Sequence, residues 1–284
     1  MLKLSLLSLL FIILARSEAQ MMPVSAHMEG GQETYVFGDT VFIRSSPGTA
    51  SSILDTLYEG LLVTIVRKTE ETSFFRGFHA PWFHVKYRKD ENEREGFIWS
   101  GLLALQPARR GNTKFIYGID RVFPKRNNEP NSSGQARYQV KVKAVVDVEK
   151  RAVESFPVEE ESAVFTSASI STGNGLEGVQ HLIAITFGGE ACGIPAYTHY
   201  YAWTGSELKK LVTLRNVSDA GQYYYTEDLV FPNQKGGRPG HLVVQIRAGE
   251  STGKANRDGE PLYREKKSQK IYRWSETELK LLNK

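Results

Sequence analysis

Cys192, the single cysteine of the chain, is the first residue to consider for covalent chemistry. Cysteine hydrolases place the thiol at the start of a helix, where the helix dipole lowers its pKa, and a nearby histidine accepts the proton. His199 and His241 follow in the sequence, but Gly193 and Pro195, directly after the cysteine, do not begin a helix. This setting favours a free thiol in a loop between strands. One cysteine also excludes an intramolecular disulfide and a cysteine-based zinc cluster.

Other catalytic and metal-binding patterns give equally little support for an enzyme. The sequence lacks the His-Glu-x-x-His motif of zinc proteases, and His79 and His84 have no third ligand close by. Segment 236–240 is rich in glycine but lacks the lysine and the following helix of a phosphate loop. We expect no serine nucleophile on a strand-to-helix elbow. A pair of carboxylates, which is all that a glycosidase needs, stays open. We predict no catalytic residue, no metal site and no cofactor.

Aromatic side chains give a better indication of a binding site. The stretch between Val66 and Trp82 is polar but holds three phenylalanines, and bare rings in such a segment are costly in water. One interpretation is burial against the C-terminal part of the chain. The other is a ligand groove, in which Arg76 and His79 meet a carboxylate of a cell-wall peptide. The candidate ligand-binding residues are Phe74, Phe75, Arg76, Phe78, His79 and Trp99.

The elements that must position these residues are strands. Short apolar alternation broken by turn residues runs from 35 to 105, and the charged run 88–95 reads as the solvated tip of a hairpin. A long alternating strand is expected around 138–148. Further strands are expected at 162–170, 180–187, 197–203, 209–216, 223–231, 241–247 and 269–274. No helical period is sustained in the mature chain, so the sequence predicts an all-β protein.

A weak internal repeat marks the C-terminal half. A His-Leu-aliphatic segment recurs 60 residues on, at 181–184 and 241–244, and each copy is followed by a Tyr-x-Trp strand and a Leu-Lys pair. The residues are Tyr201, Trp203, Leu208 and Lys209 in the first copy, and Tyr272, Trp274, Leu279 and Lys280 in the second. The period resembles that of β-propeller blades, but two copies are too few for a closed ring. We expect packed antiparallel sheets with a duplicated unit, whose two tryptophans lie in the core.

The N-terminus predicts export. A positive start at Lys3 precedes an apolar run over 4–14, and small residues follow at Ser17 and Ala19, a pattern typical of a secretory signal peptide. The run is about half the roughly 20 residues that a membrane span needs. Cleavage after Ala19 would leave Gln20 first, and we expect a secreted or periplasmic protein with no membrane span in the mature chain.

Residues 35–105 resemble the bacterial SH3 domain family. Five pieces appear in the family's order. They are Val41-Phe42-Ile43-Arg44 before Ser45-Ser46-Pro47-Gly48, then Leu57 and Gly60 before Val63 and Ile65, then Trp82 three residues before Val85, then Gly96-Phe97-Ile98, and finally Leu102-Leu103. Phe97 stands where the family commonly has tryptophan. The resemblance implies a small half-open β-barrel, of a kind common in exported bacterial proteins as a binding module beside a cell-wall hydrolase.

Together these observations predict a small SH3-like barrel followed by a larger antiparallel β-sheet domain. The boundaries are a signal peptide at 1–19, a flexible leader at 20–34, the barrel at 35–106, a linker and irregular region at 107–136, and a C-terminal β domain at 137–284. The net charge of +4 is too small and too scattered for a nucleic-acid partner. We expect a non-catalytic binding protein of the bacterial envelope, with peptidoglycan or an envelope protein as its partner. The alternative is a cell-wall hydrolase or an enzyme inhibitor whose active surface lies in the C-terminal domain.

Overall fold

The computed structural model describes residues 28–106, 108–123, 136–147, 149–276 and 278–282. The predicted signal peptide and residues 20–27 of the predicted leader lie outside this part of the chain. The described residues form strands and two short 3-10 turns, Ser100–Leu102 and Glu160–Ser162, with no α-helix among them. The predicted all-β class is therefore confirmed.

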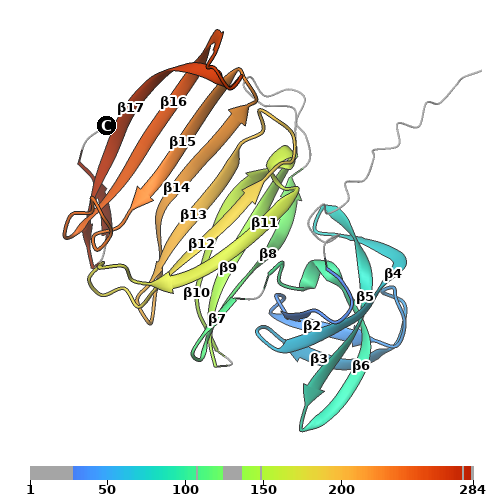
Figure 1. Ribbon diagram of the computed structural model, residues 1–284. Helices are drawn as coiled ribbons and strands as arrows, with labels where there is room; N and C mark the ends of the chain where they lie inside the picture. Colours follow the sequence, from blue (N-terminus) through green and yellow to red (C-terminus); the bar gives the residue numbers. More distant parts are fainter. Residues whose placement is uncertain (1–27, 107, 124–135, 148, 277, 283–284) are drawn as a thin grey trace, which may run out of the picture.

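The N-terminal strands form a six-stranded antiparallel sheet that curls into a half-barrel (Figure 1). Its spatial order is β1-β4-β5-β6-β2-β3. The bounds are β1 Glu33–Tyr35, β2 Thr40–Arg44, β3 Ile53–Tyr58, β4 Leu62–Phe75, β5 Phe78–Lys89 and β6 Asn92–Trp99. The apolar residues of the alternating pattern form its core. Buried as expected are Val41, Ile43, Leu57, Val63, Ile65, Trp82, Val85 and Ile98.

A second, four-stranded sheet follows directly, in the order β10-β9-β8-β7. Its strands are β7 Ala108–Arg110, β8 Thr113–Phe123, β9 Arg137–Val146 and β10 Glu149–Glu159. Much of the region 107–136, which the sequence suggested to be a linker, is therefore sheet. Residues 107 and 124–135 lie outside the described part. Strand β9 corresponds to the long alternating strand that the sequence predicted.

The C-terminal half is an eight-stranded antiparallel meander, with its strands paired in sequence order. Its bounds are β11 Phe165–Thr172, β12 His181–Gly188, β13 Ala196–Trp203, β14 Leu208–Asp219, β15 Tyr223–Val230, β16 His241–Ala255, β17 Pro261–Ser275 and β18 Glu278–Leu281. The second sheet lies against the first strands of this meander (Figure 1). Rings from the two sheets meet in a shared core, where Phe115 contacts Trp203 and both Tyr117 and Phe156 contact Phe187.

The repeat seen in the sequence corresponds to two hairpins with the same register. Trp203 pairs with Leu208 across β13 and β14, and Trp274 pairs with Leu279 across β17 and β18. Both tryptophans are buried, as expected. The connecting turns also match, because the hydroxyl of Thr204 accepts from the Glu207 amide and that of Ser275 from the Glu278 amide. The two units join edge to edge through β14 and β15, so they form one sheet and not a closed ring.

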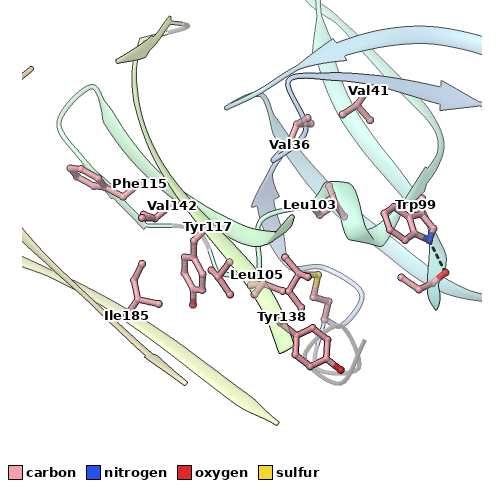
Figure 2. Packing of buried hydrophobic residues seen from close by; sticks show 14 of the residues in the cluster. Val36, Val41, Trp99, Leu103, Leu105, Phe115, Tyr117, Tyr138, Val142 and Ile185 are labelled. Carbon is pink, nitrogen blue, oxygen red and sulfur yellow. Dashed lines mark hydrogen bonds between the residues drawn. The ribbon is translucent and has the colours of Figure 1, made fainter. Parts of the chain in front are cut away.

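One hydrophobic core runs from the barrel into the space between the four-stranded sheet and the large meander. Figure 2 shows Trp99 and Val41 of the barrel joined through Leu103 and Leu105 to Tyr117, on β8. The other face of the second sheet packs on the barrel as well, in a cluster of Tyr35, Phe37, Ala104, Ile116 and Val145. Because the second sheet is covered on both faces, the barrel is held firmly against it.

Candidate binding site between the barrel and the second sheet

The residues expected to line a groove lie around the tip of the β4–β5 hairpin, but they are not equally accessible. Phe74 and Phe75 are 56% and 39% exposed, whereas Phe78 and Trp99 are buried. The Trp99 indole donates to the carbonyls of Ser73 and Ala80, and Figure 2 shows a hydrogen bond from its ring nitrogen. Phe78 and Trp99 thus belong to the barrel core, and their rings offer no surface to a ligand.

The exposed rings rest on this buried pair. The Phe75 ring meets Trp99 edge-on, with 5.1 Å between centroids, and Phe74 lies against His79 at the same distance. The polar stretch between Val66 and Trp82 is not a loop, because β4 continues to Phe75 and β5 begins at Phe78. The strands themselves therefore carry the rings. Two exposed phenylalanines, Phe74 and Phe75, therefore remain available at the hairpin tip.

The turn at this tip touches the second sheet. Arg76 has a φ of 53° and Gly77 a φ of 89°, which make the tight two-residue connection. The Val122 amide of β8 donates to the Arg76 carbonyl at 2.8 Å. A Cβ on Gly77 would lie 2.5 Å from the Val122 carbonyl oxygen, so only glycine fits there. The backbone of the turn is therefore an interdomain contact, while the side chains before it stay at the surface.

A polar cleft of ≈ 300 Å³ opens beside this contact, between the barrel and the second sheet. It is lined by Phe37, Gly38, Asp39, Thr40, Arg76, Asp120, Lys141, Lys143 and Val153. Of the residues expected to form the site, Arg76 lines this cleft. Most of its charged side chains come from β8 and β9, which were not predicted to contribute.

Asp120 organises the charges of the cleft. Its carboxylate lies 3.1 Å from the Lys141 ammonium, 3.3 Å from Arg121 Nε and 3.9 Å from Arg76 Nη1. Burial alone would raise the pKa of Asp120, but the hydrogen bond and charge of Lys141, the hydrogen bond from Arg121 and the charge of Arg76 lower it below the usual value. Three cations thus surround one carboxylate. The surplus positive charge suits a second anionic group, supplied by a ligand.

Lys143 forms the inner wall of the cleft and has no capacity left for a ligand. Its ammonium is 2.7 Å from the Phe37 carbonyl, 2.6 Å from Asp39 and 2.9 Å from Glu59. It also lies 4.8 Å from the centre of the Phe37 ring. These three acceptors satisfy the three N–H groups of the ammonium. Lys143 therefore fixes the barrel to β9 and sets the width of the cleft.

The charged run 88–95 differs in part from the solvated loop that was expected. Lys89 and Arg94 both bind Asp55 of β3, whose side chain is nearly inaccessible. Burial would raise the pKa of Asp55, but hydrogen bonds from Lys89, the Thr56 amide and Arg94 lower it to about 2. Only the remainder of the run is free to be solvated. The Asp55 cluster ties the β5–β6 hairpin to β3 and has a structural role.

The residues considered for catalysis are not brought together. Cys192 is exposed in the connection between β12 and β13, as expected for a free thiol. The ring of His199 is buried, stacked on Phe156 at 3.8 Å and bonded to Thr213, so it does not serve that thiol. Burial, with the nearby charge of Lys210, lowers the pKa of His199 to about 3. The described residues contain no group of three histidine, cysteine or acidic side chains that could hold a metal.

One serine pattern was missed in the sequence. Residues 249–253, Gly-Glu-Ser-Thr-Gly, match the Gly-x-Ser-x-Gly pattern of a serine nucleophile, although no such nucleophile was expected. A nucleophile elbow needs a sharp turn between a strand and a helix. Here Ser251 lies within β16, pairs with Tyr263 of β17 and leads into a bulge of the hairpin. The motif is therefore part of a β-ribbon and has no elbow geometry.

No helix in the described part of the chain is long and apolar enough to cross a membrane. Comparison with protein-family models, with curated proteins and with solved structures found no match to this chain.

Proposed function

We propose that the protein is an exported, non-catalytic binding protein of the bacterial envelope, and that its SH3-like barrel recognises a carboxylate-bearing peptide or glycan. The observation that carries this proposal is the cleft beside the barrel, where Arg76, Arg121 and Lys141 surround Asp120. The sequence-based candidate Arg76 lines this cleft, and the exposed Phe74 and Phe75 precede it on the same hairpin.

The chemistry of the cleft supports a ligand with an anionic end and an apolar body. The guanidinium of Arg76 is 3.9 Å from Asp120 and its side chain is 37% exposed, so it is only loosely held and can turn its N–H groups to a second carboxylate. The Lys141 side chain is also 37% exposed, and its ammonium lies 3.1 Å from the same carboxylate. Phe74 and Phe75 offer ring surface at the hairpin tip. Cell-wall peptides combine free carboxylates with short aliphatic side chains, and they are the ligand class we propose.

Incubation with purified peptidoglycan, followed by sedimentation and analysis of soluble products, separates binding from hydrolysis. We expect the protein to sediment with the polymer and to release no fragments. Released muropeptides would favour the alternative, a cell-wall hydrolase. The protein used is the exported form, which we expect to begin at or near Gln20. N-terminal sequencing that finds Met1 in a membrane fraction would contradict export.

Substitutions at the cleft connect the binding to this surface. Arg76→Gly removes the guanidinium without straining the turn, because the φ of 53° favours glycine. Lys141→Gln removes the facing ammonium. We expect the double variant to lose sedimentation with peptidoglycan while remaining folded, because Arg121 still pairs with Asp120 at 3.3 Å. Arg88→Gln is the matched control, since Arg88 is an exposed cation on β5 that does not line the cleft. An equal loss in the control would indicate nonspecific charge attraction.

A further inference from the structure

The far edge of the large sheet carries a second, separate feature. Strand β17 is 15 residues long, but β18 pairs only with Tyr272 to Ser275, and the Leu282 amide adds one bond to the Ile271 carbonyl. No described strand pairs with the outer edge of residues 261–268. This segment lies on the side of the meander away from the second sheet (Figure 1).

The direction of the backbone groups on this edge follows from strand alternation. The Ile271 carbonyl points outward, because it accepts from Leu282. Residues two apart in a strand point their backbone N–H and C=O groups to the same side. The backbone N–H and C=O groups of Tyr263, Glu265 and Lys267 therefore also point outward. The residues between them direct their backbone toward β16. The edge therefore presents donors and acceptors at the spacing of a β-ladder.

The charged side chains along this edge are mostly basic. Residues 261–268 include Arg264, Lys266 and Lys267, with Glu265 as the only acidic side chain. Glu265 is already engaged, because it accepts from the Tyr224 hydroxyl and lies 3.4 Å from Lys267. In register, Lys266 stands opposite Ala248 and Arg264 opposite Glu250. Arg264 and Lys266 therefore make one face of the free edge positive, while Glu265 offsets the charge of Lys267 on the other face.

We propose that this edge of β17 binds an extended acidic segment of a partner protein, which adds to the sheet as a further strand. The outward N–H and C=O groups supply the backbone ladder, and acidic residues at alternate positions of the partner meet Arg264 and Lys266 on one face. Lysines on an edge also prevent unspecific pairing with apolar strands. An acidic strand is the kind of partner that such an edge accepts.

The test uses the exported protein and an eight-residue peptide of alternating threonine and glutamate, with blocked ends, in a fluorescence titration. A threonine–lysine peptide is the charge control, and heparin is the polyanion probe. Lys267→Pro removes one outward N–H and leaves the ladder to β16 in place, as proline is tolerated on edge strands. Lys267→Gln is its matched control, since it removes the same charge and keeps the N–H.

We expect the acidic peptide to bind, and we expect Lys267→Pro to weaken its binding by about tenfold more than Lys267→Gln does. Amide exchange at Tyr263, Glu265 and Lys267 should slow in the complex. Two results would overturn the proposal. The first is no binding of the acidic peptide by the folded protein. The second is equal binding to Lys267→Pro and Lys267→Gln with comparable affinity for heparin, which would show a polyanion surface instead.

Discussion

The ammonium of Lys143 holds the barrel to the second sheet, and its removal should destabilise the protein strongly. The side chain is 6% exposed and contacts the Phe37 carbonyl, Asp39 and Glu59 within 2.9 Å. Lys143→Met keeps the aliphatic stem but leaves Glu59, itself 11% exposed, without this cation. Loss of one partner from a buried ion pair typically costs about 3–5 kcal/mol, and we expect a decrease in the free energy of unfolding of that size.

The same cluster provides graded controls. Asp39 is 68% exposed, so water replaces much of its interaction, and Asp39→Asn should cost less than about 1 kcal/mol. The double variant Lys143→Met with Glu59→Gln should recover part of the loss, because the buried carboxylate charge that Lys143 balances is removed as well. Urea denaturation followed by circular dichroism and tryptophan fluorescence measures each free energy. A cost below about 1 kcal/mol for Lys143→Met, or an equal cost for Asp39→Asn, would refute this account of the interface.

Three further predictions concern other parts of the molecule. Trp203→Ala should lower the free energy of unfolding by about 3–5 kcal/mol, because the ring is buried between the sheets, and an unchanged melting temperature would contradict this. Cys192→Ala should change the free energy of unfolding by less than about 0.5 kcal/mol and leave peptidoglycan binding intact, because the thiol is exposed in a loop. Loss of binding at unchanged stability would show that Cys192 takes part in binding. In the folded protein the pKa of His199 is lowered to about 3, so the ring stays neutral. In the unfolded chain the same ring takes up a proton below about pH 6.5. The contribution of His199 to the stability of the fold is therefore complete above pH 6.5 and falls as the pH drops toward 3. Between pH 7.5 and 4.5 in urea titrations, the parent should therefore lose more stability than His199→Phe does, and equal losses would show that His199 is not responsible.

Local alternation in the sequence was enough to predict most strands and the core of the barrel. It was not enough for β8, because this strand is covered on both faces. Phe115 and Tyr117 face the large sheet while Ile116 packs on the barrel, so the strand shows no alternation of apolar and polar residues. The short β7 before it has the composition of a loop. Both effects made residues 108–123 read as irregular.

The candidate site was predicted only in part, for a related reason. Arg76 and the exposed Phe74 and Phe75 could be found because they are unusual within a polar stretch. Asp120, Lys141 and Lys143 could not, because charged residues on a long strand normally face water. They face the barrel here, and only the packing of two sheets shows it. Phe78 and Trp99 were among the candidate ligand-binding residues because the sequence did not show that β5 begins at Phe78, or that both rings turn into the barrel core.

We propose that the cleft around Asp120 binds a carboxylate-bearing ligand without converting it. Its most direct test is a calorimetric titration with a soluble cell-wall peptide, using the parent protein, the Arg76→Gly and Lys141→Gln double variant, and Arg88→Gln. We expect saturable binding to the parent and to Arg88→Gln, at least about tenfold weaker binding to the double variant, and an intact peptide at the end of the titration. Unchanged affinity in the double variant, or a cleaved peptide, would contradict it.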